Sequence, residues 1–471
     1  MTTVTFEVPV MFLLISLAVA LLSSAQSAQP IFANDGTLDV RAHGVWYSRE
    51  KGWILDINAT GITRWQDTPA GCYASPAPDE STPMMGQVEY QLFRPSRDGQ
   101  SIRLNYLPGD ASASFERLDA LPPSCGAEDL TTETAIFDVF ASVMARHYSF
   151  FDARGVDWDA QIAAAHPHVQ DGMGEAALWA VLAGLLDPLG DSHTKLIGMV
   201  DGEPRRAQAG LGATLPMIRN GMGEGAWLNG LVDQLFNDVL DPGAELIADR
   251  VIVGEITPES GAPIGYIQIF TMGGFTTEHT PGSLEWSQAE LAALSDILDD
   301  ALTRFADHQA IILDLSNNRG GYDAVTRAIA ARFTDEAFLG YRVSVPGVPE
   351  ATEDYEITPH DGVRYSGPVY VMTSDVTVSG GEITTMMLRQ LPNVVHVGGV
   401  TRGAFSTPLA KPLPNGWYLE LSNEVFEDGS GAVFEGRGLP PAIMVDIYPE
   451  AAPVAGHRAA IERVVGMIEG G

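Results

Sequence analysis

The chain has 471 residues, and its 61 acidic residues outnumber its 27 lysines and arginines, which gives a formal charge of −34. Such an acidic surface repels phosphate backbones, so we expect no nucleic-acid partner. The 45% hydrophobic content is normal for a globular protein, so the acidity does not indicate disorder. At roughly 100–200 residues per domain, the length predicts several domains with cores of their own.

An apolar run, residues 8–22, opens the chain and is followed by small residues. The run is shorter than the ~20 residues of a spanning helix and fits the hydrophobic region of a secretory signal. We therefore expect residues 1–28 to be a signal peptide, the mature protein to be exported (periplasmic or extracellular), and no stable membrane span after its removal. The first residues contain Glu7 and no basic residue, which is unusual for a signal. An uncleaved anchor and a cytoplasmic chain are the alternatives.

Two cysteines are present, Cys72 and Cys125, and both lie in turn-rich segments. In an exported protein such a pair is expected to form one disulfide, and two free thiols are the alternative. Because there is no further cysteine and no HxxxH-type histidine spacing, we predict no metal site and no cofactor.

Residues 29–126 alternate apolar and polar positions in short runs, separated by turns such as Arg97-Asp98-Gly99. This pattern predicts a small antiparallel β domain. From about residue 131 the apolar spacing becomes helical, with Thr132 as a candidate N-cap, and a second helix is predicted over 173–186. We therefore expect a helical subdomain over 127–200.

The stretch 197–250 is rich in glycine and weakly patterned, too short and too poor in strands to predict a PDZ module. From Val251 onward, strands alternate with helices, which predicts a mostly parallel sheet with covered faces and an α/β core over 201–471. The predicted strands are 265–270, 310–315, 369–372, 394–400 and 417–421, and the predicted helices are 291–305, 323–333 and one starting at Ser379.

Ser379 stands in the turn Thr373-Ser-Asp-Val-Thr-Val-Ser-Gly-Gly-Glu382, between a buried strand and a helix. One interpretation is structural: Ser379 caps the helix and Glu382, three residues on, completes a capping box. The other is catalytic, because a helix N-terminus offers free N–H groups to an oxyanion beside Ser379. The spacing by itself leaves both interpretations open.

Three further segments carry candidate groups. The turn Asp314-Leu-Ser-Asn-Asn-Arg-Gly-Gly321 follows a parallel strand and can aim backbone N–H groups into the crevice at the strand ends. His193, in Asp191-Ser-His-Thr194, is a candidate base, although a lone histidine in a loop is often structural. Glu435 either orients a histidine or pairs with Arg437.

These motifs, in this order, together with Gly398-Gly-Val-Thr-Arg-Gly-Ala-Phe405, Leu413-Pro-Asn-Gly-Trp-Tyr-Leu-Glu-Leu421 and the tail from Phe434 to Asp446, resemble a known family. The chain over about 131–449 is similar to the serine peptidases of the C-terminal processing (tail-specific) and tricorn-core family. That family also includes the retinoid-binding modules of the interphotoreceptor matrix. The resemblance implies a crotonase-like (ClpP/crotonase) αβ core and peptide-bond hydrolysis through Ser379.

The family that the sequence resembles has two catalytic arrangements. Processing peptidases use a Ser/Lys dyad, and Ala404 stands where their lysine would be. The whole chain has three lysines, Lys51, Lys195 and Lys411, and none lies in that segment. The tricorn-like branch instead uses a histidine from the helical subdomain as the base, and Asp191-Ser-His-Thr194 resembles the motif of that branch.

The resemblance then assigns roles, which stay expectations here. His193 takes the proton of Ser379, and the N–H groups of Gly380 and of Gly320 or Gly321 bind the oxyanion. Either Glu435, through Ser192, or Glu382 orients the base, and the sequence does not choose between them.

Peptides or proteins are the expected substrates, and the oligomeric state stays open. A non-catalytic ligand-binding protein on the same fold is the alternative function. An esterase of another family is a third interpretation, weakened because Thr377-Val-Ser-Gly-Gly381 does not match a GxSxG elbow.

Overall fold

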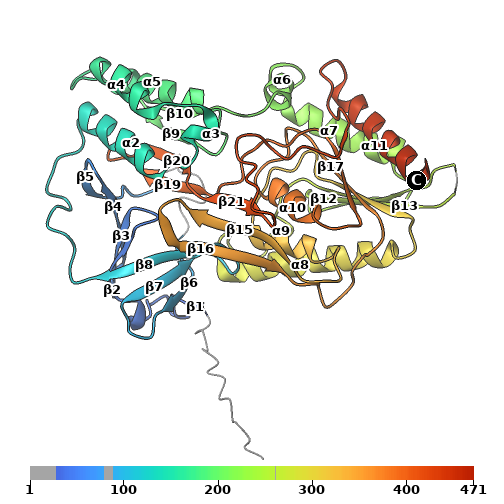
Figure 1. The fold of residues 1–471 in the computed structure, drawn as a ribbon, viewed down its shortest axis with the longest axis horizontal. Coiled ribbons are helices and arrows are strands. Elements are labelled where there is room, and N and C mark those ends of the chain that lie inside the picture. Colours follow the sequence, from blue (N-terminus) through green and yellow to red (C-terminus); the bar gives the residue numbers. More distant parts are fainter. Residues whose placement is uncertain (1–27, 79–88, 260, 471) are drawn as a thin grey trace, which may run out of the picture.

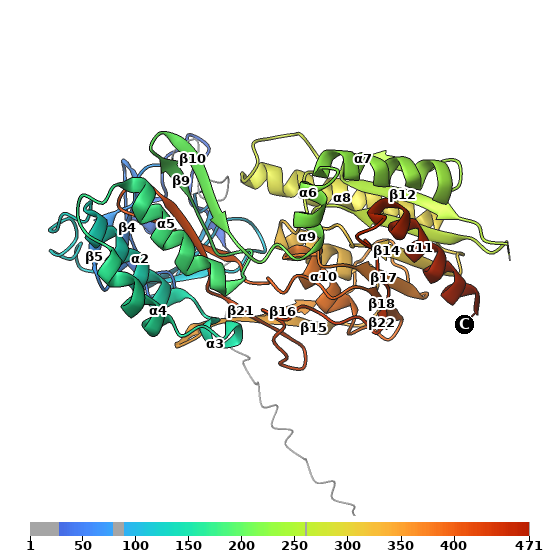
Figure 2. The same cartoon turned by 90° about the horizontal axis from the view of Figure 1, so that it is seen from above.

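The computed structural model describes residues 28–78, 89–259 and 261–470, which form a mixed α/β protein with several sheets. Two lobes lie side by side in Figure 2, and Figure 1 shows the chain order of their elements. The predicted signal peptide falls almost wholly on residues 1–27, outside the described ones. Within the described part, no helix combines the length and the apolarity needed to cross a bilayer.

An eight-stranded antiparallel sheet opens the N-terminal lobe, in the order β1-β6-β7-β8-β2-β3-β4-β5. Its short strands alternate buried and more exposed positions, as the sequence pattern predicts, and large side chains such as Trp46 and Phe93 are fully buried. The elements are β1 (Gln29–Pro30), η1 (Val40–Ala42), β2 (Gly44–Ser48), β3 (Trp53–Asn58), β4 (Gly61–Thr68), β5 (Gly71–Ala74), β6 (Leu92–Pro95), β7 (Ser101–Asn105) and β8 (Ala113–Leu118).

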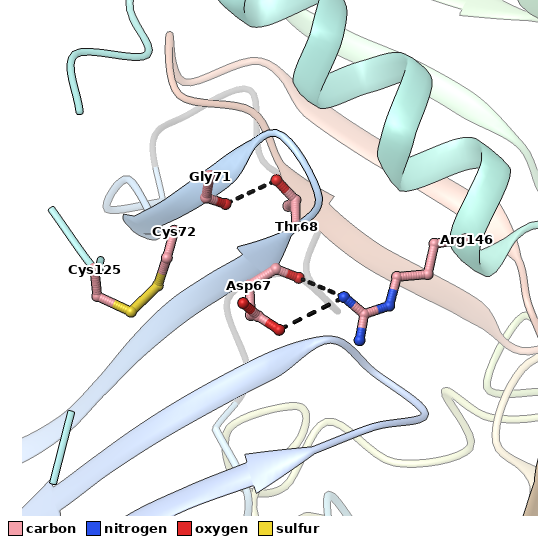
Figure 3. Close-up of a disulfide and its surroundings, with 6 residues drawn as sticks. All are labelled: Asp67, Thr68, Gly71, Cys72, Cys125 and Arg146. Atoms are coloured by element: carbon pink, nitrogen blue, oxygen red, sulfur yellow. Dashed lines mark hydrogen bonds and ion pairs between the residues drawn. A yellow bond between two sulfur atoms is a disulfide. The ribbon is translucent and has the colours of Figure 1, made fainter. Parts of the chain in front are cut away.

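A disulfide joins Cys72 of β5 to Cys125, which confirms the predicted pairing (Figure 3). Nearby, the Arg146 guanidinium of the following helix lies 3.5 Å from the carboxylate of Asp67 and 3.3 Å from its carbonyl oxygen. The bond and the ion pair together hold the β4–β5 edge of the sheet to the chain that leads into the helices. In the chain-entropy model such a bond contributes about 2–4 kcal/mol.

Helices cover this sheet on the side away from β1. The first, α2 (Glu133–His147), begins at the predicted N-cap Thr132, whose side chain accepts the N–H of Ala135 at 3.4 Å. The apolar side chains predicted for its inner face, Ile136 and Phe140 among them, are buried. The remaining elements are α3 (Phe151–Arg154), α4 (Trp158–Ala165), η2 (His166–His168), α5 (Glu175–Leu186) and η3 (Asp187–Leu189).

A four-stranded antiparallel sheet, ordered β10-β9-β20-β19, completes the N-terminal lobe. It combines β9 (Lys195–Val200) and β10 (Glu203–Gln208) with β19 (Pro408–Pro412) and β20 (Tyr418–Ser422) from late in the chain. The prediction that the strand near 417–421 extends the parallel sheet is therefore wrong. Every residue of β20 is buried, so its apolar pattern predicted a central strand but carried no information about which neighbours it would pair with.

The C-terminal lobe is built on a seven-stranded sheet, ordered β11-β12-β13-β14-β17-β18-β22. Strands β13, β14, β17, β18 and β22 run parallel, and β11 and β12 add an antiparallel edge. The strands are β11 (Glu245–Ile247), β12 (Val251–Ile256), β13 (Ile264–Ile269), β14 (Ala310–Asp314), β17 (Val369–Thr373), β18 (Val394–Gly398) and β22 (Ile443–Met444).

Helices cover both faces of this sheet, as Figure 2 shows. One face packs on α8 (Leu284–Arg304), α9 (Asp323–Ala330) and α10 (Gly380–Leu388), and the other on α6 (Thr214–Asn220), α7 (Glu224–Gln234) and α11 (Pro453–Gly470). The stretch that looked weakly patterned thus supplies α6, α7 and the π-helical turn η4 (Leu235–Val239). A small sheet of β15 (Phe338–Val345), β16 (Val348–Ile357) and β21 (Val425–Asp428) lies toward the N-terminal lobe.

Candidate active site

Ser379 stands between β17 and α10, as predicted, in an unusual backbone conformation with φ 58° and ψ −121°. The other non-glycine residues with positive φ in the described part of the chain are exposed, whereas Ser379 is half-buried. A non-glycine residue held in such a region costs on the order of 1–3 kcal/mol and persists only where the surroundings enforce it. A turn that only reverses the chain does not need this strain, so we infer that the backbone conformation of Ser379 serves another purpose.

Hydroxyl groups fix the turn that ends in Ser379 against the neighbouring turn after β14. Ser374 Oγ donates to the Ser316 carbonyl at 2.6 Å, and Thr377 Oγ1 donates to the Leu315 carbonyl at 2.7 Å. The N–H of Val378 donates to the Asn318 carbonyl at 3.1 Å. The two turns therefore form one hydrogen-bonded unit at the ends of adjacent parallel strands.

The second turn, residues 314–321, has an internal support. The fully buried Asp314 accepts the N–H of Ser316 at 2.8 Å and the hydroxyl of Tyr266 at 2.8 Å. The oxygen that accepts from Tyr266, Asp314 Oδ2, also lies 2.7 Å from Nε2 of His457, a buried residue of α11. The C-terminal helix thus supports the start of the turn, although nothing in the sequence near residue 457 signals a role at the site.

Glycines bring the two turns into contact. A Cβ added to Gly320, whose φ is 76°, would lie 2.6 Å from Cβ of Ser379 and 2.9 Å from the nitrogen of Gly380. Only glycine fits this position without moving Ser379. The Gly-Gly pair of the sequence motif is therefore required by the close approach of the two turns.

Two backbone N–H groups are available beside Ser379. Gly320 donates its N–H to Asn318 Oδ1 at 2.8 Å, and Gly381 donates to the Val378 carbonyl at 3.1 Å. In residues 28–78, 89–259 and 261–470, neither Gly321 N–H nor Gly380 N–H has an acceptor, and a Cβ on Gly380 would lie 3.2 Å from Gly321 N. Of the two glycines that the sequence left open, Gly321 is the one with a free donor.

Glu382 is fully buried and holds residues 401–406, hereafter the bridging segment, against the Ser379 turn. Its carboxylate accepts from Ser379 N at 3.2 Å, which is the glutamate half of the predicted capping box. A dedicated set of donors comes from the bridging segment: Thr401 Oγ1 at 2.6 Å, Gly403 N at 2.6 Å and Ala404 N at 2.9 Å. Burial raises the pKa of Glu382, and the hydrogen bonds from these donors oppose that rise.

Ala404 lies directly beside the serine, because its carbonyl accepts the N–H of Ser379 at 3.1 Å. The three lysines are engaged elsewhere. Lys51 and Lys195 pair with Glu424 and Glu420, and Lys411 Nζ lies 3.2 Å from both Gly52 O and Gln66 Oε1.

His193 lies in the loop between η3 and β9, in the N-terminal lobe, and is half-buried. Asp191 shapes this loop, since its carboxylate accepts from His193 N at 2.9 Å and from Thr194 Oγ1 at 2.7 Å. Burial lowers the pKa of the imidazole to about 4, while Asp191 and contact with the Ser406 backbone oppose that shift. His193 Nδ1 has no hydrogen-bonding partner among the described residues, and the same holds for Ser192 Oγ.

Glu435 reaches the bridging segment from the opposite side. It accepts the N–H groups of Phe405 at 2.8 Å and Ser406 at 3.1 Å, and it pairs with Arg154 at 3.1 Å. Arg437, the alternative partner considered from the sequence, donates to the Val433 carbonyl instead. Burial first, and then the nearby Asp191 carboxylate, raise the pKa of Glu435 to about 8.

Arg154, the last residue of α3, is the member of this constellation that the sequence did not reveal. Its guanidinium donates to the carbonyl oxygens of Gly190 at 2.8 Å and Gly403 at 3.1 Å, pairs with Glu435, and lies 3.8 Å from Asp191. It therefore joins the His193 loop, the bridging segment and Glu435. A single arginine in the segment Phe151-Asp-Ala-Arg-Gly155 carries no motif that would identify it.

The bridging segment contacts both halves of the constellation. Ala404 O binds Ser379 N, and the Ser406 backbone contacts the His193 imidazole. Among the residues that the structure describes, no group of three or more His, Cys, Asp or Glu side chains could hold a metal ion. The arrangement is a serine at a strained helix start, two free N–H donors, an imidazole that contacts the same bridging segment, and two buried carboxylates.

Comparison with known proteins defines the class. Residues 263–445 match the model of peptidase family S41, and this range contains Ser379, both glycine turns, the bridging segment and Glu435. The chain carries a serine peptidase domain and is a hydrolase of that class. The domain is a member of peptidase family S41.

Solved structures show the same fold over most of the chain. A candidate peptidase from Parabacteroides merdae is 21% identical with a TM-score of 0.55, and the match covers 72% of this chain and 97% of that one. Mature CPAF in complex with lactacystin is 13% identical with a TM-score of 0.52, covering 72% and 99% of the two chains. At these identities the likeness establishes the fold and leaves residue roles to the site itself.

Proposed function

We propose that the protein hydrolyses peptide bonds with Ser379 as the nucleophile and His193 as the general base, on a crotonase-like core. The observation that supports this most directly is the strained Ser379 at a helix start, next to the two unoccupied N–H groups of Gly380 and Gly321. A plain helix N-cap needs neither the strain nor a second turn of glycines packed on it.

In the proposed reaction, Ser379 Oγ attacks the carbonyl carbon of the peptide bond while the His193 imidazole takes its proton. The carbonyl oxygen becomes an oxyanion, which accepts hydrogen bonds from Gly380 N–H and Gly321 N–H, each worth about 3 kcal/mol in known cases. His193 then returns the proton to the leaving amine, which gives an acyl-Ser379 intermediate. Water, activated by the same imidazole, hydrolyses the ester and regenerates Ser379.

Of the two carboxylates that the sequence left open, we assign the orienting role on the base side to Glu435, together with Arg154 and Asp191. Glu435 contacts Arg154 and the Ser406 backbone, and both of these lie beside the His193 loop. In this proposal Glu435 orients His193 through Ser192. The Ser192 hydroxyl, which has no partner among the described residues, forms its hydrogen bonds when the substrate binds. Glu382 is assigned to fixing the bridging segment on the nucleophile turn.

We also propose that the protein is exported and that a peptidase core over 201–471 follows a β-rich domain over 29–126 and a helical subdomain over 127–200. The Cys72–Cys125 disulfide supports export, because such bonds persist in oxidising compartments. Peptides or proteins are the substrates on this proposal.

A fluorophosphonate probe tests the assignment, with the wild type, Ser379→Ala, His193→Ala and Ser283→Ala compared. Ser283 is a matched control, because it caps α8 through its side chain at 3.1 Å from Trp286 N. Labelling of the wild type and of Ser283→Ala, with loss in the other two, is the expected result. Equal labelling of the wild type and Ser379→Ala overturns the proposal, and an unlabelled, folded wild type favours the non-catalytic binding protein.

A further inference from the structure

A cavity of about 670 Å³ lies between α7, the β11–β12 hairpin and the turn after β14. Its volume is in the range of pockets that hold small ligands or peptide side chains. Leu228 and Val232 from one face of α7, together with Leu246 and Phe270, give it apolar walls. Leu246 is 39% exposed and lines the cavity.

The cavity lies next to the reacting groups. Arg319, which lines it, immediately precedes Gly320 and donates its backbone N–H to the Phe270 carbonyl at 2.9 Å. Two residues after Phe270, Cγ of Met272 lies 3.0 Å from the position of a Cβ on Gly380. An extended peptide advances about 3.3 Å per residue, so the cavity lies within a few residues of a bond held at Ser379.

Asn317 lines the cavity and offers an unused donor. Its side chain is 98% buried (2% exposed), and its amide Nδ2 has no acceptor among the residues that the structure describes. Arg319 Nε donates to the Asn317 Oδ1 at 3.1 Å, which fixes the amide orientation. A buried donor without a partner is unfavourable, and an acceptor on a bound ligand would satisfy it. A peptide carbonyl is the natural acceptor beside a peptidase centre.

The charges around the cavity favour a cation. Three carboxylates line it, those of Glu224, Asp233 and Asp249, against the guanidinium groups of Arg250 and Arg319. Glu224 is neutralised, because it pairs with Arg319 at 2.8 Å and with Arg219 at 2.9 Å, which leaves Asp233 and Asp249 against the single guanidinium of Arg250. The carboxylates of Asp233 and Asp249 have no side-chain partner in the described part of the chain.

We infer that this cavity is a specificity subsite that takes a lysine or arginine side chain of a peptide substrate, an inference that rests on the proposed function. The aliphatic stem lies along Leu228, Val232 and Leu246, the cationic head reaches Asp233 and Asp249, and the peptide carbonyl accepts from Asn317 Nδ2. The formal charge of −34 attracts the same basic peptides over a longer range.

Matched peptides test the subsite. A series of internally quenched peptides places lysine, norleucine or glutamate at one position at a time on either side of the cleaved bond. We expect kcat/KM to favour lysine over glutamate at least tenfold at one position, and this preference to fall to threefold or less in Asp233→Asn/Asp249→Asn. Leu246→Lys, at an exposed position, places a cation in the cavity and should reverse the preference toward glutamate.

Three controls separate the outcomes. Asp300→Asn, an exposed acid on α8, should keep the preference, and 0.5 M salt should weaken a general charge effect equally at all positions. Binding of labelled lysine and glutamate peptides to Ser379→Ala, followed by fluorescence anisotropy, reports on the subsite without turnover. Normal probe labelling of Ser379 with no position-specific preference overturns the subsite alone, whereas absence of labelling overturns the proposed function.

Discussion

The two sides of the candidate active site are built in different ways. The nucleophile side consists of two turns at the ends of neighbouring strands, β14 and β17, tied by short hydrogen bonds between their own hydroxyl and backbone groups. The base side, with His193, comes from the N-terminal lobe and meets the nucleophile side through Arg154, Glu435 and the bridging segment.

Different kinds of contact therefore fix the nucleophile side and the base side. A parallel sheet fixes the spacing of its own strand ends, so the nucleophile side depends on local backbone geometry. The base side depends on side chains that cross between lobes, so its geometry is sensitive to changes far from Ser379.

Replacing His193 by alanine removes the proposed base and should have the largest effect. We expect kcat to fall by about 10⁴-fold or more, as when triad members are removed from other serine hydrolases. Steady-state kinetics on a quenched peptide, with circular dichroism to verify folding, provide the measurement. A loss below tenfold would mean that another group takes the proton of Ser379.

Gly320→Ala breaks the nucleophile side without touching a reacting group. The new Cβ would lie 2.6 Å from Cβ of Ser379, so we expect a loss of about 10²–10³-fold in kcat, comparable with the loss of an oxyanion donor. The matched control is Gly347→Ala, where φ is also positive, at 75°, and nothing lies within 4 Å of an added Cβ. Both variants carry the backbone strain, so only the contact with Ser379 distinguishes them, and equal activities would contradict this account.

Arg154→Ala should lower kcat by about 10- to 100-fold with little change in KM, because we assign Arg154 to positioning the His193 loop and Glu435. Arg154→Lys keeps the charge but loses the forked geometry that contacts Gly190, Gly403 and Glu435, so it should recover only part of the rate. Arg146→Ala, which removes a pair with Asp67 on the far side of the lobe, is the control. Recovery of full activity by lysine would show that charge alone suffices.

The pH profile sharpens the base assignment. Because burial lowers the pKa of His193 to about 4, the imidazole stays neutral and able to accept a proton down to that pH. The acid limb of kcat/KM should therefore lie near pH 4, well below the ordinary histidine value. Asp191→Asn removes the carboxylate that raises the His193 pKa and should move the limb lower still. A limb at pH 6.5 or above in the wild type would show that a different or more exposed group titrates.

His457→Leu tests the support behind the nucleophile side and should have the smallest effect. Loss of the 2.7 Å contact with Asp314 leaves a buried carboxylate with one partner fewer, so we expect destabilisation by about 1–3 kcal/mol. A two- to tenfold fall in kcat with unchanged KM should accompany it at a temperature where the variant is fully folded. Chemical denaturation and initial rates measure the two effects, and an unchanged kcat would restrict His457 to a structural role.

The sequence allowed more of the nucleophile side to be predicted than of the base side. The position of Ser379 at a helix start and the capping contact of Glu382 depend on neighbours close in sequence, and the structure shows both. The Arg154–Glu435 pair and the pairing of β20 with β9 join residues more than 200 positions apart. Periodicity and turn chemistry describe local structure, so they carry no signal for such pairings.

The pairing of β20 with β9 also affects how the chain can be made. The centre of the four-stranded sheet is filled by Tyr418–Ser422, so β9 has an open edge until that segment leaves the ribosome. An exposed strand edge is a template for wrong pairing. Biogenesis therefore includes an interval in which a nearly full-length nascent chain is vulnerable to aggregation, and a product terminated before residue 401 would lack both the closing strands and the bridging segment. Partial chains would then be inactive as peptidases and prime targets for quality control.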